Sequence, residues 1–173
     1  MQIILPEFCL VALVGVSGSG KTTFARTHFR PTEIVSSDHC RALVADDEND
    51  QTATDDAFKL LYFLTEKRLK RRRLTVIDAT NVQRPARQSL IELAQPHGCP
   101  SIAIVLDMPE EILNQRRQQR TDRHFGDYVL PRQRRELGQS VVWLNQEGFQ
   151  RVFVLKSPEE VEVVEVVRQV GIL

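Results

Sequence analysis

The chain has 173 residues, of which 42% are hydrophobic and 27% charged, a composition typical of a folded globular protein and not of a disordered one. Lysine plus arginine equals aspartate plus glutamate, at 23 each, and this net charge of zero disfavours a protein that grips long duplex DNA through a global basic field. Three cysteines (Cys9, Cys40 and Cys99) fit no zinc motif, and no apolar run approaches the roughly 20 residues of a membrane span. We therefore expect a cytoplasmic protein without a membrane partner, folded as one domain over residues 1–173.

Strand and helix patterns alternate along the sequence. The apolar run Phe8–Val14 is typical of a strand buried on both faces, and further strands are predicted at 33–37, 74–77, 101–106 and 151–155. Helices are predicted from Lys21 onward, over 53–71, 85–94, 109–120 and 131–146, and from the N-cap Ser157 to the end of the chain. This alternation predicts an α/β fold with a parallel β-sheet of about five strands flanked by helices. The motifs at 15–22 and 116–123, described next, make it a P-loop NTPase-type fold with a helical arginine-bearing lid.

A glycine-rich turn follows the first predicted buried strand. Residues 15–22 match the pattern G-x-x-x-x-G-K-[ST], with a strand before and a helix after, so a simple Gly/Ser-rich turn is disfavoured. Such a loop wraps backbone N–H groups around phosphates, the lysine reaches the β- and γ-phosphates, and the threonine hydroxyl binds Mg²⁺. The candidate nucleotide-binding residues are Gly15, Ser17, Gly18, Ser19, Gly20, Lys21 and Thr22, with Lys21 also catalytic and Thr22 also a metal ligand.

Two charged residues follow the second predicted strand. Asp38 stands where a carboxylate can take the proton of an attacking hydroxyl, and Arg41, three residues on, shares its face if the segment is helical. Arg41 would then hold a phosphate of the acceptor or steady the transferring group. The alternatives are an N-cap role for Asp38 and a solvated surface position for Arg41.

The third predicted strand ends in another acid. Asp78 lies where a Walker-B-type carboxylate contacts Mg²⁺, directly or through water, although a strand-end acid that caps a turn has the same pattern. Thr80 and Asn81 follow it and are candidates for contact with the acceptor.

An arginine stripe marks the region after the fourth predicted strand. Arg116, Arg120 and Arg123 share one face of a continuous helix and are predicted to close on the donor phosphates as a lid. A solvated helix face is the alternative. The densest basic run, 67–73, precedes the third strand and so lies at the end of the sheet away from the predicted site. We interpret it as a solvated helix end, with an auxiliary nucleic-acid contact as the alternative.

Taken together, these motifs resemble the kinase module of bacterial polynucleotide kinase–phosphatase, the RNA end-healing enzyme. The resemblance covers essentially the whole chain and rests on the P-loop and on three more specific segments: Ser36–Gln51 with its S-S-D-x-x-R start and acidic stretch 46–50, Val76–Asn81, and Arg116–Arg123.

The resemblance implies transfer of a phosphate from ATP, or another NTP, to 5′-OH ends of RNA or DNA, with Mg²⁺. It assigns Asp38 as general base, Arg41 to the acceptor phosphate and the γ-phosphate, and Arg116 and Arg120 to the lid. It also implies that this chain is an excised N-terminal module, followed in the full-length protein by phosphatase and ligase-like modules.

The residues alone leave two other functions open. One is a P-loop kinase of a small-molecule hydroxyl acceptor, because short motifs do not describe acceptor pockets. The other is a module that binds and hydrolyses NTP as a switch, against which the position of Asp38 argues. Whether NTP turnover requires a hydroxyl acceptor discriminates between transfer and hydrolysis.

Overall fold

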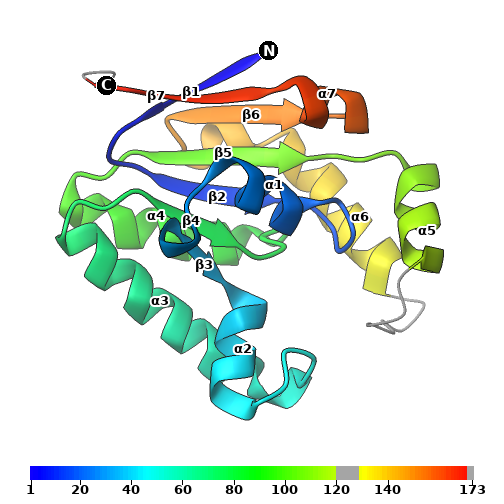
Figure 1. Ribbon diagram of the computed structural model, residues 1–173, viewed down its shortest axis with the longest axis horizontal. Helices are drawn as coiled ribbons and strands as arrows, with labels where there is room; N and C mark the ends of the chain where they lie inside the picture. Colours follow the sequence, from blue (N-terminus) through cyan, green and yellow to red (C-terminus); the bar gives the residue numbers. More distant parts are fainter. Residues whose placement is uncertain (120–128, 171–173) are drawn as a thin grey trace.

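The computed structural model describes residues 1–119 and 129–170 and has a five-stranded parallel sheet at its centre (Figure 1). In spatial order the strands are β3 (Ile34–Ser36), β4 (Thr75–Asp78), β2 (Leu10–Val14), β5 (Ser101–Leu106) and β6 (Arg151–Leu155). Every neighbouring pair is parallel, which confirms the predicted α/β fold. Because the chain crosses to β3 and β4 on one side of β2 and to β5 and β6 on the other, a crevice opens beyond the carboxyl end of β2.

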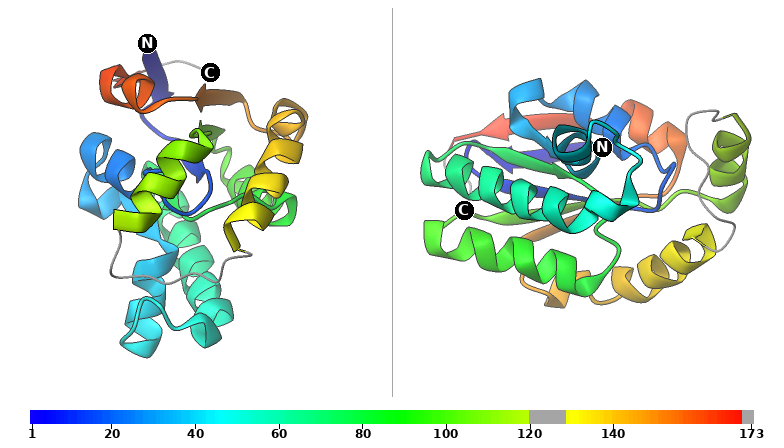
Figure 2. Two further views of the ribbon diagram at one scale, coloured as in Figure 1. Left: turned by 90° about the vertical axis from the view of Figure 1, so that its right-hand side faces the viewer. Right: turned by 90° about the horizontal axis from the view of Figure 1, so that it is seen from below.

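Helices cover both faces of this sheet. They are α1 (Lys21–His28), α2 (Ser37–Ala45), α3 (Thr54–Lys70), α4 (Arg84–Ala94), α5 (Glu110–Gln119), α6 (Val129–Val141) and α7 (Pro158–Val163). Short 3₁₀ turns occur at Pro31–Glu33, Gln51–Ala53, Gln95–His97 and Leu144–Gln146. Helix α1 covers one face, α4 and α6 lie on the other, and α3 runs along the β3 edge (Figure 2). Strands β2 and β5 are buried at every position, as their uninterrupted apolar sequences predict.

Two predicted helix ends were wrong. The helix expected over 131–146 is α6, which starts at Val129 with proline in its first turn and ends at Val141. The chain then tightens into i→i+3 bonds, from Trp143 N to Ser140 O and from Glu147 N to Leu144 O, and this 3₁₀ geometry replaces the last predicted α-turn.

The C-terminal segment also differs from its prediction. Ser157 does cap a helix, accepting a hydrogen bond from Glu160 N at 3.3 Å, but α7 is short and does not close the chain. Instead β7 (Glu165–Gln169) pairs in parallel with β1 (Gln2–Pro6), a second small sheet beside β6 (Figure 1). The valine-rich sequence of β7 favours a strand once β1 offers a partner.

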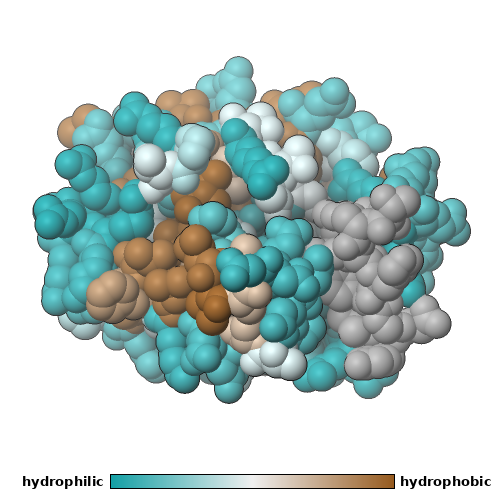
Figure 3. All heavy atoms as spheres, turned by 60° about the horizontal axis from the view of Figure 1, so that its bottom comes forward, coloured by the Kyte–Doolittle hydropathy of each residue, from teal (hydrophilic) through white to brown (hydrophobic). Residues whose placement is uncertain are grey.

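The surface over α3 and α4 is mainly polar and carries one apolar area (Figure 3). Among the exposed large hydrophobic side chains is Phe63 of α3, at 55%. In the described ranges, no helix is both long and apolar enough to pass through a lipid bilayer.

Candidate active site

The crevice beyond β2 is a cavity of about 1460 Å³. Its walls come from the P-loop, the start of α2, the segment after β4, and helices α5 and α6. Because these are the carboxyl ends of the strands, the fold brings together the sequence-predicted motifs at one end of the sheet.

The P-loop backbone depends on glycine at two kinds of position. A Cβ atom at Gly15 would lie 2.7 Å from Ser19 Oγ and 2.8 Å from the carbonyl oxygen of Leu106, so any side chain there would force the loop away from β5. Gly18 and Gly20 have φ angles of 83° and 101°, a left-handed region that other residues avoid. These conformations let α1 begin directly after the loop, with its N-terminus facing the cavity.

In the P-loop, hydrogen-bonding groups that are expected to contact phosphate are bonded to other protein groups. Lys21 Nζ is buried and donates to the carbonyl oxygens of Gly15 and Val16, at 2.8 and 2.9 Å. The N–H of Ser17 donates to the side-chain oxygen of Gln133, on α6, at 2.8 Å. Gln133 was not predicted from the sequence, because its partner lies 116 positions away. Its oxygen accepts as a phosphate oxygen would, so α6 and a nucleotide compete for this N–H.

The residues predicted to hold Mg²⁺ are in contact. Thr22 Oγ1 donates to Asp78 Oδ2 at 2.8 Å, which brings both oxygens to the edge of the phosphate loop. Burial raises the pKa of the Asp78 carboxyl, and the hydrogen bond from Thr22 and the charge of Lys21 oppose this shift. A hydroxyl and a nearly buried carboxylate that face a phosphate site form an oxygen donor set suited to Mg²⁺. The described contact of the Asp78 side chain is therefore with Thr22, and not with the backbone of a turn that it would cap.

Asp38 and Arg41 form an ion pair in α2, where both residues line the cavity. Arg41 Nη1 lies 2.7 Å from Asp38 Oδ1, and both residues are in α2, one turn apart. The N-cap of α2 is Ser36, whose hydroxyl accepts from His39 N, so the alternative that Asp38 caps this helix is wrong. The alternative of a solvated Arg41 is also wrong, because the residue is buried. Its Nε–H is buried and has no hydrogen-bond partner among the described residues.

The acidic segment 46–50 supports this pair through its backbone. The carbonyl oxygen of Glu48 accepts from Arg41 Nη1 at 2.9 Å. Asp50 caps the following 3₁₀ turn, accepting from the N–H of Thr52 at 2.9 Å. The segment therefore helps to orient Arg41 through a backbone carbonyl oxygen, a contact that does not depend on the acidic side chains of 46–50.

Of the predicted arginine stripe, Arg116 is among the described residues. From α5 it donates through Nη1 to the carbonyl oxygens of Gly18 and Ser19, at 3.2 and 2.9 Å, and so lies against the P-loop. Its contact with donor phosphates stays a prediction. The solvated-face alternative does not hold for this residue. Arg120 and Arg123 lie outside the described residues.

Thr80 and Asn81 line the cavity, but their described contacts are within the protein. The carbonyl oxygen of Thr80 accepts from the N–H of Gly15 at 2.9 Å, and Asn81 Nδ2 donates to the carbonyl oxygen of Leu13 at 2.7 Å. Asn81 is buried with a φ of 48°, so its side chain ties the segment after β4 to β2. Contact of either residue with an acceptor stays a prediction.

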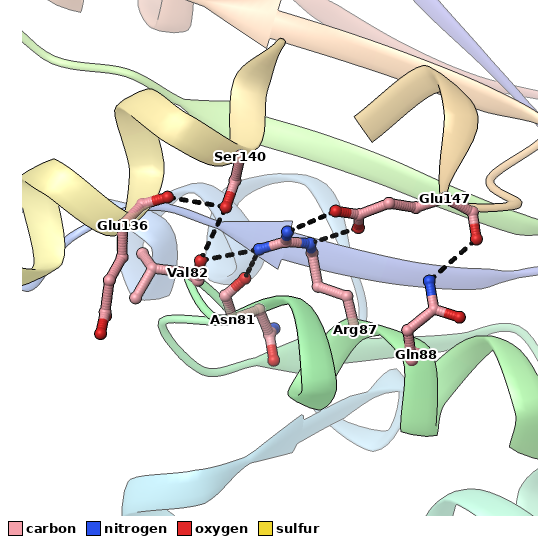
Figure 4. A network of polar contacts seen from close by, with 7 residues as sticks. All are labelled: Asn81, Val82, Arg87, Gln88, Glu136, Ser140 and Glu147. Atoms are coloured by element: carbon pink, nitrogen blue, oxygen red, sulfur yellow. Dashed lines mark hydrogen bonds and ion pairs between the residues drawn. The ribbon is translucent and has the colours of Figure 1, made fainter. Parts of the chain in front are cut away.

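A buried ion pair contacts the segment after β4 (Figure 4). Arg87 of α4 donates to both carboxylate oxygens of Glu147 at 2.7 Å, and the two side chains are 0% and 2% exposed. Arg87 Nη1 also donates to the carbonyl oxygens of Asn81 and Val82. The sequence analysis missed this pair, since only the fold places α4 beside the segment after α6. Full burial of an arginine is uncommon unless it is paired.

Comparison with known proteins agrees with this geometry. Residues 10–144 match the protein family described as "AAA domain". Among solved structures, a chain of the Pnkp1/Rnl/Hen1 RNA repair complex is 24% identical with a TM-score of 0.66, covering 80% of this chain and 47% of that one. Shikimate kinase from Acinetobacter baumannii is 19% identical with a TM-score of 0.53, covering 90% and 88%. APS kinase CysC from Mycobacterium tuberculosis is 15% identical with a TM-score of 0.55, covering 91% and 95%.

The family match spans more than half of the sequence, and the chain belongs to this AAA-domain family. The structural likenesses establish a kinase-like P-loop fold. The chain spans about half the length of the RNA repair chain, at 47%. No curated protein matches the sequence.

Proposed function

We propose that this member of the AAA-domain family is a polynucleotide 5′-kinase, which transfers the γ-phosphate of ATP, or another NTP, to the 5′-OH end of RNA or DNA. The observation that carries the proposal is the Asp38–Arg41 pair at 2.7 Å in the cavity that the P-loop also lines. A switch that hydrolyses NTP needs a residue that positions water, whereas a fixed carboxylate beside a buried arginine suits a hydroxyl next to a phosphate.

In the proposed step, the carboxylate of Asp38 accepts the proton of the 5′-hydroxyl. The freed oxygen bonds to the γ-phosphorus while the bond from that phosphorus to the β–γ bridging oxygen breaks, so that NDP and a 5′-phosphate end leave. Arg41 orients Asp38 through Oδ1, and its Nε–H donates to a phosphate oxygen of the acceptor or of the transferring group.

On the donor side, Lys21 exchanges its loop carbonyls for the β- and γ-phosphate oxygens, and the loop N–H groups bind the same phosphates. Mg²⁺ would be held by Thr22 and, through water, by Asp78, and when bound it neutralises charge on those phosphates. Arg116, with Arg120 and Arg123, is proposed to move from the loop carbonyls to the phosphates as the lid closes.

The test is transfer of γ-³²P from ATP, with Mg²⁺, to a 5′-OH oligonucleotide, beside a 5′-phosphate oligonucleotide and a panel of sugars, nucleosides and shikimate-like acids. The proposal expects label on the 5′-OH oligonucleotide alone. Label on a small molecule would keep a kinase and replace its substrate, and acceptor-independent release of phosphate would favour the hydrolytic switch.

Two variants test the assigned base. Asp38→Asn is expected to keep NTP affinity and to lose transfer by about 100-fold or more, the usual contribution of general base catalysis. Asp55→Asn makes the same chemical change at an exposed position outside the cavity and is expected to leave the rate unchanged. Equal rates in the two variants would remove Asp38 from the role of base.

A further inference from the structure

A second cavity, of about 730 Å³, lies at the amino ends of the strands, away from the P-loop. The segments that line it precede β2, β3, β4 and β5 or belong to β7 and the residue after it. They contribute five arginines against two acids, Glu7 and Glu33. The five are Arg30, Arg68, Arg72, Arg73 and Arg168. Since the whole chain has no net charge, this is a marked local excess of positive charge.

Two of the five guanidinium groups are hydrogen-bonded within the fold. Arg168 forms a bidentate ion pair with the buried Glu33, at 2.8 and 2.7 Å, which neutralises one of the two acids. Arg68 donates to the carbonyl oxygen of Leu74 at 2.8 Å. Arg68 thus differs from the other charged residues of the basic run 67–73, which are exposed at and after the end of α3, as the interpretation of a solvated helix end expects.

The turn after α3 directs a further arginine toward this cavity. Arg72 has a φ of 52°, a left-handed conformation that residues other than glycine rarely adopt, and its guanidinium lies 4.5 Å from the centroid of the Phe8 ring. Strained backbone of this kind concentrates at sites of function. Arg30 and Arg73 are exposed at the surface of the same cavity, on separate segments.

We propose that this arginine pocket is a second nucleic-acid contact, which binds backbone phosphates of a single strand at the end of the sheet opposite the P-loop. Guanidinium groups match phosphate oxygens in planar, bidentate geometry. Pro6, Phe8 and Pro100 add apolar surface beside the arginines, which suits bases and sugars better than it suits a small inorganic anion. The inference goes beyond the kinase proposal and does not depend on which acceptor is phosphorylated.

The test measures binding while the P-loop site is filled. Saturating Mg²⁺ and a non-hydrolysable ATP analogue occupy the P-loop, and fluorescence anisotropy follows a single-stranded oligonucleotide with a 5′ phosphate and a 3′ fluorophore. Arg30→Ala/Arg73→Ala removes two exposed arginines of the pocket. Lys67→Ala/Arg71→Ala removes the same charge from the basic run 67–73, at exposed positions that do not line the cavity.

The proposal expects the pocket double variant to weaken binding by about tenfold or more and to lower the salt dependence by about two released counterions. The control double variant is expected to stay within about twofold of wild type. Equal losses in both variants would mean general charge attraction only, and displacement of the strand by AMP would reassign the pocket to a free nucleotide; either result overturns the proposal. Equal melting temperatures of the two variants confirm that the fold is intact. The readout is binding and not phosphate transfer, so its failure can be told apart from failure of the proposed kinase activity.

Discussion

Replacing either member of the Arg87–Glu147 pair should destabilise the protein strongly, whereas replacing both should not. Arg87→Met removes both hydrogen bonds to the carboxylate and leaves Glu147, 2% exposed, as a buried charge without its partner. It also removes the donor to the carbonyl oxygens of Asn81 and Val82. Glu147→Leu leaves the guanidinium of Arg87 equally buried and without its counter-charge.

The magnitudes follow from burial. Removing one partner of a buried ion pair costs about 3–5 kcal/mol, because the other charge is left desolvated and uncompensated. In the double variant both charges are gone, and the remaining cost is chiefly the carbonyl oxygen of Asn81, at about 1–3 kcal/mol. The carbonyl oxygen of Val82 keeps a hydrogen bond from Ser140 Oγ at 3.0 Å. The summed losses of unfolding free energy in the two single variants should therefore exceed the loss in the double variant by several kcal/mol.

Urea unfolding followed by far-UV circular dichroism measures the four free energies of the cycle, with the slope m compared across variants. We expect a coupling energy above about 2 kcal/mol, and a higher KM for the acceptor in the double variant, because Asn81 and Val82 lose the contact that fixes them. If the single losses simply add up in the double variant, or if Arg87→Met costs less than about 1 kcal/mol, the pair does not hold this segment.

Three other predictions follow from the site. Asp78→Asn should stabilise the protein without ligand yet weaken Mg²⁺-dependent NTP binding. Burial raises the folded pKa of this carboxyl above its usual 3.8. The wild type therefore loses stability as pH rises through that pKa and the carboxyl becomes a buried charge, and it regains this stability as pH falls. The gain in melting temperature should thus be larger at neutral pH than in acid, and a gain independent of pH would contradict this cause. Gln133→Ala should tighten binding of a non-hydrolysable ATP analogue by about 2–10-fold in calorimetry, as expected for loss of one competing hydrogen bond to Ser17 N; weaker binding would mean that Gln133 donates to phosphate instead. Gly15→Ala should lower both stability and nucleotide affinity, since its Cβ would lie 2.8 Å from a carbonyl oxygen of β5, and unchanged affinity would show that the loop relaxes freely.

Local sequence determined the fold and half of the site. The five strands of the main sheet occur where the sequence predicts them, and β2 and β5 are the clearest cases, because a strand buried on both faces needs an uninterrupted apolar sequence. The P-loop was equally predictable from the sequence, since glycine, lysine and threonine each meet a local requirement at a fixed spacing. Asp38 and Arg41 lie one helical turn apart, so their contact at 2.7 Å also follows from spacing alone.

Only the tertiary structure decided contacts between segments that are distant in sequence. The strand β7 exists because β1 supplies its partner, and no local pattern joins Ile3 to Val166. The contact of Gln133 with Ser17 and the pair of Arg87 with Glu147 depend in the same way on how α6 and α4 pack on the sheet. A residue's helical or strand period gives the face on which it lies, but the partner on that face is set by the packing of the whole chain.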